Sequence, residues 1–355
     1  MMAKILTIVL AGAAAVAAAG ALVVRLPAVE DKLFDAALEK AMAGPGAAVF
    51  KDDGLKVFFC GTGSPLPSAR RAQNCTAVIA GDRFFIVDLG SGSFETVQAA
   101  RLPADRLSAI FLTHFHSDHI GDLSEANLGS WVTARPAPLS VYGPKGVERV
   151  VAGENEALAL DAGYRTAHHG KGVAPPRSKG MVARPFDHSA PLVVFDDGGL
   201  KVTSFPVRHD PVDAAVGYRF EYQGRSVVIS GDTAYSESLV AAAKDVDLLI
   251  HEAQANHMVA GMRDAAAKAG LATLAKIFSD IPSYHTTPAE AARAANEAGA
   301  ELLILSHLTP APDNSVAKRI FMRGVDKIRP GKVMIAEDRL LVTLPRDGVV
   351  VFGKL

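Results

Sequence analysis

Residues 111–119 read F-L-T-H-F-H-S-D-H, and they constrain this 355-residue chain more than any other stretch. Three histidines and an aspartate follow directly after an apolar run that is typical of a buried strand end. Imidazole nitrogens and carboxylate oxygens are the ligands that zinc and similar metals prefer. His114 and His116 are two residues apart and point the same way on an extended backbone. Asp118 and His119 lie where a helix is about to begin, so one loop can serve two adjacent metals.

Three later segments each offer one more ligand at the end of an apolar strand. His209 follows an alternating strand, Asp232 stands in S-G-D-T after residues 227–229, and His307 follows residues 302–305. A single histidine in such a place is usually a core or surface residue, but three ligands in the same setting are hard to explain by packing. The sequence therefore predicts seven metal ligands: His114, His116, Asp118, His119, His209, Asp232 and His307.

The order of these motifs resembles the metallo-β-lactamase superfamily, and within it the ribonuclease Z and arylsulfatase-like branch. The resemblance covers nearly all of residues 55–355. It implies an α/β fold, a four-layer αβ/βα sandwich of two mixed sheets with helices outside and metals at one edge. The motifs that carry it, besides the histidine loop, are G-T-G-S-P at 61–65, D-L-G-S-G at 88–92, G-Y-R-F at 217–220, S-G-D-T at 230–233, H-E-A at 251–253, H-T-T-P at 285–288 and L-S-H at 305–307.

The resemblance also implies two zinc ions, with Mn²⁺ or Fe²⁺ as alternatives. One ion is expected on a first ligand group (His114, His116 and His209), the other on a second ligand group (Asp118, His119 and His307), with Asp232 as a bridge. Two adjacent cations would lower the pKa of a shared water towards neutrality, to roughly 7 for a single zinc, and the resulting hydroxide is the expected nucleophile. In this superfamily Asp88 is expected to steady the metal loop through hydrogen bonds.

Two more residues are expected to take part in catalysis beside the ligand Asp118. Thr287, Pro288 and Glu290 form a capping-box pattern that fixes the start of a helix. His285 stands just before this helix start and is placed to donate a proton to a leaving group. Glu252 is expected to orient His285 through a hydrogen bond.

The expected reaction is hydrolysis of small anionic substrates, either phosphodiesters or sulfate esters. The superfamily's transfer-RNA-processing members carry a long flexible arm between the third histidine and the bridging aspartate, and here only two short strands fit between His209 and Asp232. A net charge of −1 and few aromatic residues also disfavour nucleic acid, so transfer RNA is not the expected substrate. The alternatives are a β-lactamase or other amide or ester hydrolase, a ribonuclease Z-type nuclease, and a non-enzymatic metal-binding module.

The N-terminal residues 1–27 are expected to be separate from the fold. Lys4 precedes an uncharged, alanine-rich run that ends before Arg25, which is the pattern of a secretory signal peptide and is also long enough for a membrane anchor. Both interpretations place the protein outside the cytoplasm, in the periplasm or attached to the inner membrane. Residues 28–54 are expected to form a connector, with the hydrolase domain at 55–355.

Three further features leave alternatives open. Cys60 and Cys75 are the only cysteines, and they form either a disulfide, which export would permit, or two small buried side chains. Residues 147–185 are predicted to begin as a helix and to end in a basic loop rich in glycine and proline at 170–180. The oligomeric state is open, with a homodimer as one alternative.

Overall fold

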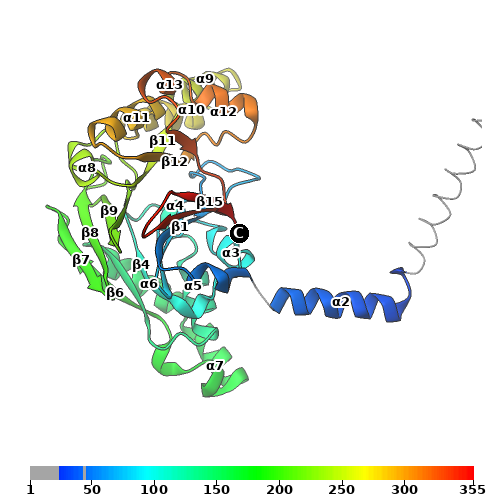
Figure 1. Cartoon of the computed structure of the whole chain (residues 1–355). Helices are drawn as coiled ribbons and strands as arrows, with labels where there is room; N and C mark the ends of the chain where they lie inside the picture. The colour runs from blue at the N-terminus through cyan, green and yellow to red at the C-terminus, as the bar shows by residue number, and fades with distance from the viewer. Residues whose placement is uncertain (1–23, 43–44) are drawn as a thin grey trace, which may run out of the picture. The chain divides into compact units, whose positions relative to one another are not determined.

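The structure is a computed structural model that describes residues 24–42 and 45–355, and it divides the chain into two compact units, Met1–Pro45 and Gly46–Leu355. In the first unit, the structure describes helix α2 (Pro27–Met42; Figure 1). This helix carries exposed apolar side chains such as Phe34. Most of the apolar run predicted as a signal peptide or anchor lies outside the described residues. Within the described residues, no helix is long and apolar enough to cross a membrane.

The second unit begins before the expected boundary at Leu55. The 3₁₀ helix η1 (Pro45–Phe50) leads into it, Val49 is buried, and the Phe50 ring lies 6.3 Å from that of Phe84. Residues 46–54 of the expected connector therefore belong to this unit, because Val49 and Phe50 make apolar contacts with it.

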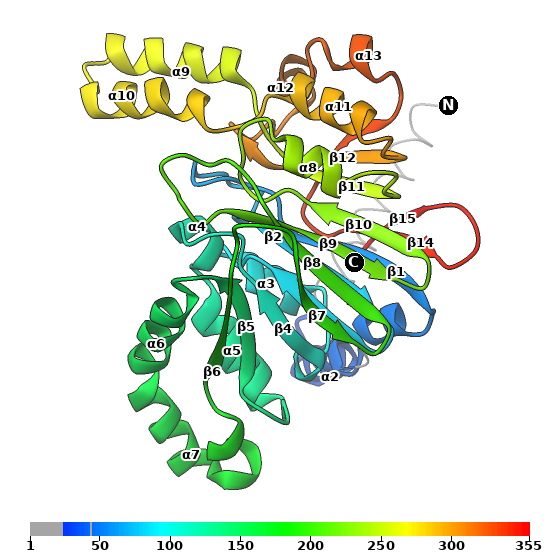
Figure 2. The same cartoon turned by 90° about the vertical axis from the view of Figure 1, so that its left-hand side faces the viewer.

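Two mixed sheets form the centre of the second unit (Figures 1 and 2). In spatial order, the first sheet contains β15 (Val351–Lys354), β14 (Leu340–Pro345), β1 (Gly54–Gly61), β2 (Cys75–Ala80), β3 (Arg83–Val87), β4 (Leu107–Phe111), β5 (Leu139–Pro144) and β6 (Met181–Phe186). The second sheet contains β13 (Val333–Ile335), β12 (Leu302–Thr309), β11 (Leu248–Gln254), β10 (Arg225–Ile229), β9 (Val216–Tyr222), β8 (Leu200–Pro206) and β7 (Leu192–Asp197). Strands β3 to β6 are parallel in the first sheet and β10 to β13 in the second; the others pair antiparallel.

Strand alternation explains how each sheet is buried on both faces. In β1, Val57 and Phe59 point into the core between the two sheets, whereas Phe58 and Cys60 point to the helices on the other face. Side chains two apart share a face of a strand, so one strand supplies both layers. Phe111 lies at the centre of the inner layer, and each such buried ring contributes about 1.5–3 kcal/mol.

Helices cover the outer face of each sheet, which completes the four layers and confirms the expected αβ/βα sandwich. The first sheet is covered by α3 (Ser93–Ala99), α5 (Leu123–Val132) and α6 (Val147–Ala157). The second is covered by α8 (Glu237–Ala242), α11 (Pro288–Glu297), α12 (Ser315–Phe321) and α13 (Val325–Ile328). The shorter or projecting helices are η2 (Ala104–Arg106), α4 (Ser117–Ile120), α7 (Ala159–Val173), η3 (Pro176–Ser178), α9 (Asn256–Lys268), α10 (Ala272–Asp280) and η4 (Ile281–Ser283).

The loop predicted at 170–180 is partly helical, which corrects that prediction. Helix α7 continues to Val173, and only Gly170 departs from helical geometry, with φ 78° and ψ 163°. Glycine adopts a positive φ without steric cost, so the chain kinks there and resumes the helix. In Figure 2, α7 projects from the side of the first sheet, and α9 and α10 project from the side of the second.

Candidate metal centre

The histidine loop follows β4 and is anchored from both sheets. The Leu112 amide donates to Tyr142 of β5, and the Leu112 carbonyl accepts a 2.6 Å hydrogen bond from the Tyr218 hydroxyl of β9. His116 is the N-cap residue of α4, so the expected start of a helix at this point is confirmed. The loop is therefore fixed between the two sheets before any ligand is considered.

The first ligand group brings three imidazoles together. His116 Nδ1 lies 2.9 Å from His114 Nε2 and 3.4 Å from His209 Nε2. His209 Nδ1 donates to the Tyr284 carbonyl at 3.1 Å, which leaves Nε2 facing the other two rings. Burial lowers the pKa of all three histidines below the usual value, so each is neutral, the form that binds a metal.

The second ligand group combines two imidazoles with a carboxylate. Asp118 Oδ2 lies 3.1 Å from His307 Nε2 and 3.4 Å from His119 Nε2. Asp232 Oδ2 lies 3.3 Å from His307 Nε2 and 3.4 Å from His119 Nε2. The same oxygen is 4.0 Å from Nε2 of both His114 and His209 in the first group. Asp232 thus lies between the two groups, in the position expected of a bridge.

An irregularity in β12 aims His307 at the site. The ladder between β11 and β12 shifts register so that Glu252 pairs with Ser306 and Ala253 with Leu308, which leaves His307 as the extra residue of a bulge. Its φ is 46°, and a left-handed backbone costs a side-chain-bearing residue roughly 1–2 kcal/mol. The fold maintains this strain at a ligand position, as bulges near functional sites commonly do.

Asp88 supports the second ligand group from behind. Its Oδ2 lies 2.8 Å from His119 Nδ1, so the ring donates there and leaves Nε2 for the site. The Thr113 amide donates to Asp88 Oδ1, and the Thr113 hydroxyl and the Asn74 amide donate to Oδ2. The contact expected for Asp88 is present, whereas Asn74 has no sequence signal that singles it out.

His285 lies over both ligand groups and is held by Glu252. Its ring centre is 5.1 Å from that of His209 and 5.8 Å from that of His307. Its Nδ1 donates to Glu252 Oε1 at 2.9 Å, which leaves Nε2 as the atom available to a substrate. Burial alone would lower the pKa of His285, but Glu252, Asp232 and Asp118 outweigh burial and raise that pKa to about 9. The metal-free site therefore holds His285 as an imidazolium at neutral pH.

The capping box that precedes α11 is present as predicted. The Thr287 hydroxyl accepts from the Glu290 amide, and the Glu290 carboxylate accepts from the Thr287 amide. Glu252 Oε1 also accepts the amides of Thr233 and Thr286, each at 3.1 Å. One carboxylate therefore contacts the segment after Asp232 and the segment after His285.

The donor set fits cations. His119 Nε2 and Asp232 Oδ1 are buried without a hydrogen-bond partner, and within the described residues every ion-pair partner of Asp118 and Asp232 is a histidine. Two buried carboxylates with only imidazoles to neutralise them require added positive charge. Burial lowers the pKa of His119 and His307, but the adjacent carboxylates outweigh it and raise both, so protons balance the charge in the metal-free site.

Glycines allow the segments around the site to approach closely. A side-chain carbon at Gly90 would lie 2.1 Å from the Asp118 carbonyl oxygen, and one at Gly61 would lie 1.7 Å from the Gln73 carbonyl oxygen. Larger residues would push these backbones apart. All seven predicted ligands, with His285 and Glu252, thus meet at one edge of the sandwich.

Comparisons with known proteins agree with this geometry. Residues 85–308 match the model of a β-lactamase superfamily domain. The chain is 37% identical over 262 residues to ribonuclease Z of Mycobacterium bovis, a match that covers 72% of this chain and 87% of that protein. It is 36% identical over 260 residues to ribonuclease Z of Mycolicibacterium paratuberculosis, with the same coverage.

Solved structures share the fold at lower identity. The metallo-β-lactamase fold protein YhfI from Bacillus subtilis has a TM-score of 0.58 at 23% identity and covers 85% of this chain and 100% of its own. Human tRNase Z, short form, has a TM-score of 0.59 at 21% identity and covers 82% of this chain and 99% of its own. Together, the sequence matches and the site show that this chain belongs to the metallo-β-lactamase superfamily, as a ribonuclease Z-like, metal-dependent hydrolase of ester bonds.

Proposed function

We propose that this hydrolase cleaves phosphodiester bonds with two zinc ions and that RNA is its substrate class. The observation that carries the proposal is the position of Asp232, whose Oδ2 lies within 4.0 Å of ligand nitrogens in both groups. A carboxylate bridge of this kind suits a binuclear site. Two bound metals would generate a nucleophile from water at neutral pH and would stabilise the attacking and leaving oxygens of the ester.

The protein's own groups supply the proton for the leaving oxygen. His285 Nδ1 is occupied by Glu252, so the proton on Nε2 is the one left for a leaving oxygen, on a ring that lies beside those of His209 and His307. Glu252 fixes the ring orientation and favours its charged form. Bound metals would offset the charges of Asp118 and Asp232 and bring the pKa of His285 down towards the operating pH, the range that best suits a general acid.

The relatives favour RNA over the small ester first expected from the sequence. Those that match over most of their length are named ribonuclease Z, which supports the nuclease alternative. A partly exposed aromatic ring also lies in the site: Tyr284 is 5.1 Å from His209 and 4.9 Å from His285, measured between ring centres. One such ring can stack on one nucleobase beside the scissile bond, so a low overall aromatic content does not exclude RNA.

A second candidate is an exported phosphodiesterase of small substrates. The connection from His209 to Asp232 contains only β9, β10 and short turns, which leaves no long arm to hold a large RNA.

The structure also contains a Cys60–Cys75 disulfide, one of the two alternatives that the sequence left open, and disulfides persist mainly outside the cytoplasm. We propose an extracytoplasmic location on these grounds. A reporter fused after Ala28 should be exported, and a fusion retained in the cytoplasm would contradict this.

One set of assays tests the substrate. Metal-loaded protein would be given an RNA with a 3′ extension, bis(p-nitrophenyl) phosphate, p-nitrophenyl sulfate and a chromogenic cephalosporin, with Asp232→Asn as the inactive control. We expect cleavage of the RNA and the phosphodiester, with the higher kcat/KM for RNA. Cleavage of the small phosphodiester alone would favour the second candidate. Faster turnover of the sulfate or the cephalosporin would overturn the phosphodiesterase proposal.

A further inference from the structure

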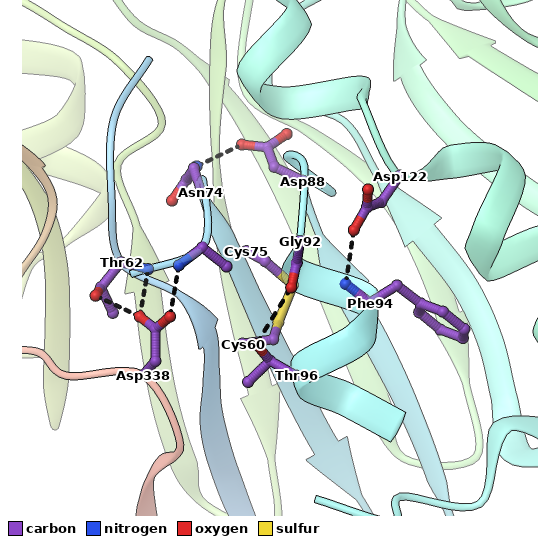
Figure 3. Close-up of a disulfide and its surroundings, with 11 residues drawn as sticks. Cys60, Thr62, Asn74, Cys75, Asp88, Gly92, Phe94, Thr96, Asp122 and Asp338 are labelled. Carbon is purple, nitrogen blue, oxygen red and sulfur yellow. Dashed lines mark hydrogen bonds between the residues drawn. A yellow bond between two sulfur atoms is a disulfide. The ribbon is translucent and has the colours of Figure 1, made fainter. Parts of the chain in front are cut away.

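The Cys60–Cys75 disulfide joins the end of β1 to the start of β2 (Figure 3). These strand ends lie next to residues that contact the metal centre. The β1–β2 ladder shifts register between Phe59 and Gly61, so Cys60 is the extra residue of a bulge and has no partner in the ladder. Both sulfurs are buried in the layer between the first sheet and α3. The covalent bond therefore fixes two strand ends where the regular hydrogen-bond ladder is interrupted.

One end of the disulfide leads to His119. Asn74 directly precedes Cys75 and is buried, and its side-chain amide donates to Asp88 Oδ2 at 3.0 Å. The same nitrogen lies 3.3 Å from His119 Nδ1. Asp88 is the group that holds His119, so a shift of Cys75 would move Asn74 and disturb both contacts.

The other end leads to His307. Two residues after Cys60, the Thr62 carbonyl accepts a 3.0 Å hydrogen bond from the Leu308 amide. Leu308 directly follows His307, whose strained backbone needs its neighbours to hold it in place. His119 and His307 belong to the same ligand group, so each end of the disulfide supports one ligand of that group.

We propose that the Cys60–Cys75 disulfide, acting through Asn74 and Thr62, is a positioning element for the second ligand group. This rests on the metal centre of the proposed function but not on the choice of substrate. The first ligand group is less directly connected to the disulfide. The Tyr284 carbonyl holds His209, and only His114 touches the same network, through Thr113 Oγ1, which also donates to Asp88. Loss of the disulfide should therefore weaken the second metal more than the first.

Asp338 acts as a second clamp and sets the size of the effect. One of its oxygens accepts the amide and hydroxyl of Thr62, and the other accepts the amide of Ala72 (Figure 3). The loop between β1 and β2 thus stays closed at its base without the disulfide. Loss of an outer-shell partner usually weakens metal binding by about 10- to 100-fold, and we expect an effect near the lower end.

Metal affinities of the full chain test the proposal. The variants are Cys60→Ala/Cys75→Ala and Asn74→Ala, with Leu107→Ala as a control that empties part of the same core at the far end of β4. Zinc would be titrated against a chromophoric chelator at fixed pH, with thermal unfolding of the metal-free proteins recorded in parallel. The variant His116→Ala identifies which binding step of the zinc titration belongs to the first ligand group.

We expect the cysteine pair variant and Asn74→Ala to bind the metal of the second group about tenfold more weakly, with a clearly smaller effect on the first. Leu107→Ala should unfold at a lower temperature but keep both affinities, since distant sites act independently. The cysteine variant could be less stable but keep both metal affinities, or it could lose both affinities equally. Either result would mean that the disulfide only stabilises the fold and does not position the second ligand group. If the cysteine variant does not fold, Asn74→Ala decides, and an unchanged second affinity overturns the proposal. Wild-type protein that binds two metals but cleaves no phosphodiester would sink the proposed function alone.

Discussion

The two ligand groups share Asp232 but are built in different ways. The first consists of imidazoles kept neutral by burial, and two of its rings come from one loop. The second consists of Asp118 with His119 and His307, whose pKa values are raised by adjacent carboxylates. The supports of the second group reach it from several strands, through Asp88, Asn74 and Thr62. The histidine loop supplies two ligands to each group, so the groups differ in protonation and in the contacts that support them rather than in the origin of their ligands.

This difference has a functional side. The first group can bind a metal without added protons to expel, because its histidines are already neutral. The second group must release protons and depends on precise backbone placement. We therefore expect the two metals to respond differently to mutation and to pH, and the following predictions test that expectation.

Replacing Asp232, the residue that both ligand groups share, should have the largest effect on activity. It should disturb both metals, so the two ligand groups should no longer respond differently. Asp232→Ala takes away the only carboxylate within 4.0 Å of both groups among the ligand contacts described. Activity should fall by at least about three powers of ten on every substrate, because metal stabilisation is worth several kcal/mol. Metal analysis and rates on an RNA and on bis(p-nitrophenyl) phosphate measure this. His116→Ala is the matched comparison and should lose only the first metal.

Removing the proton donor should spare both groups. His285→Ala deletes a ring placed by Glu252 and the α11 cap, so both metals and the fold should be retained. Turnover of RNA should slow by about two to four powers of ten, the usual range for a general acid.

The leaving group provides the control for that variant. Nitrophenolate leaves without protonation, so the loss on bis(p-nitrophenyl) phosphate should be much smaller than the loss on RNA. An equal loss on both substrates would mean that His285 contacts the ester oxygen electrostatically or has only a structural role.

Substitution of Tyr284 tests whether its ring, which lies beside His209 of the first ligand group, binds RNA. Tyr284→Leu removes the ring but keeps the carbonyl that holds His209, so metal content should not change. Stacking on a base is worth about 1–3 kcal/mol, so kcat/KM for RNA should fall about 5- to 150-fold. Tyr284→Phe keeps the ring and should match the wild type. The RNA-stacking role is wrong if Tyr284→Leu slows the small phosphodiester as much as RNA.

The smallest expected effect is in proton release. In metal-free protein the pKa values of His119 and His307 are raised above 6.5, so stability from these groups is present below pH 6.5 and is lost as the pH rises through the raised values. At neutral pH, zinc binding to the second group should release about one to two protons, and binding to the first group almost none. Calorimetry of His116→Ala in buffers of different ionisation heat isolates the second group. Proton release near zero in that variant would contradict the proposed difference in protonation between the two ligand groups.

The sequence predicts well which side chains converge at the candidate site, because each predicted ligand follows an apolar strand and strand ends on one side of a sandwich meet. His209, Asp232 and His307 lie far apart in the chain, yet each is placed by this simple rule and by the resemblance of the motifs. The capping box is also local, so Thr287 and Glu290 are found from spacing alone. Features of short range and regular geometry are therefore within reach of sequence reasoning.

Long-range and irregular features are not. The Cys60–Cys75 pairing depends on a bulge that the spacing does not reveal. Asn74 becomes important only when Asp88 and His119 are in place. The last residues of helix α7, from Gly170 to Val173, are missed because Gly170 looks like a breaker, although its free φ lets the helix resume. These features depend on register and dihedral angles, which tertiary packing decides.

Glu252 Oε1 has a consequence for motion within the site. This single oxygen accepts from His285, from the amide next to Asp232 and from the amide of Thr286. When thermal fluctuation displaces β11, the acid and the bridging segment are carried in the same direction. Their separation should vary less than the position of either one. The distance between His285 and the bridging segment can therefore stay constant while the sheet that contains β11 fluctuates.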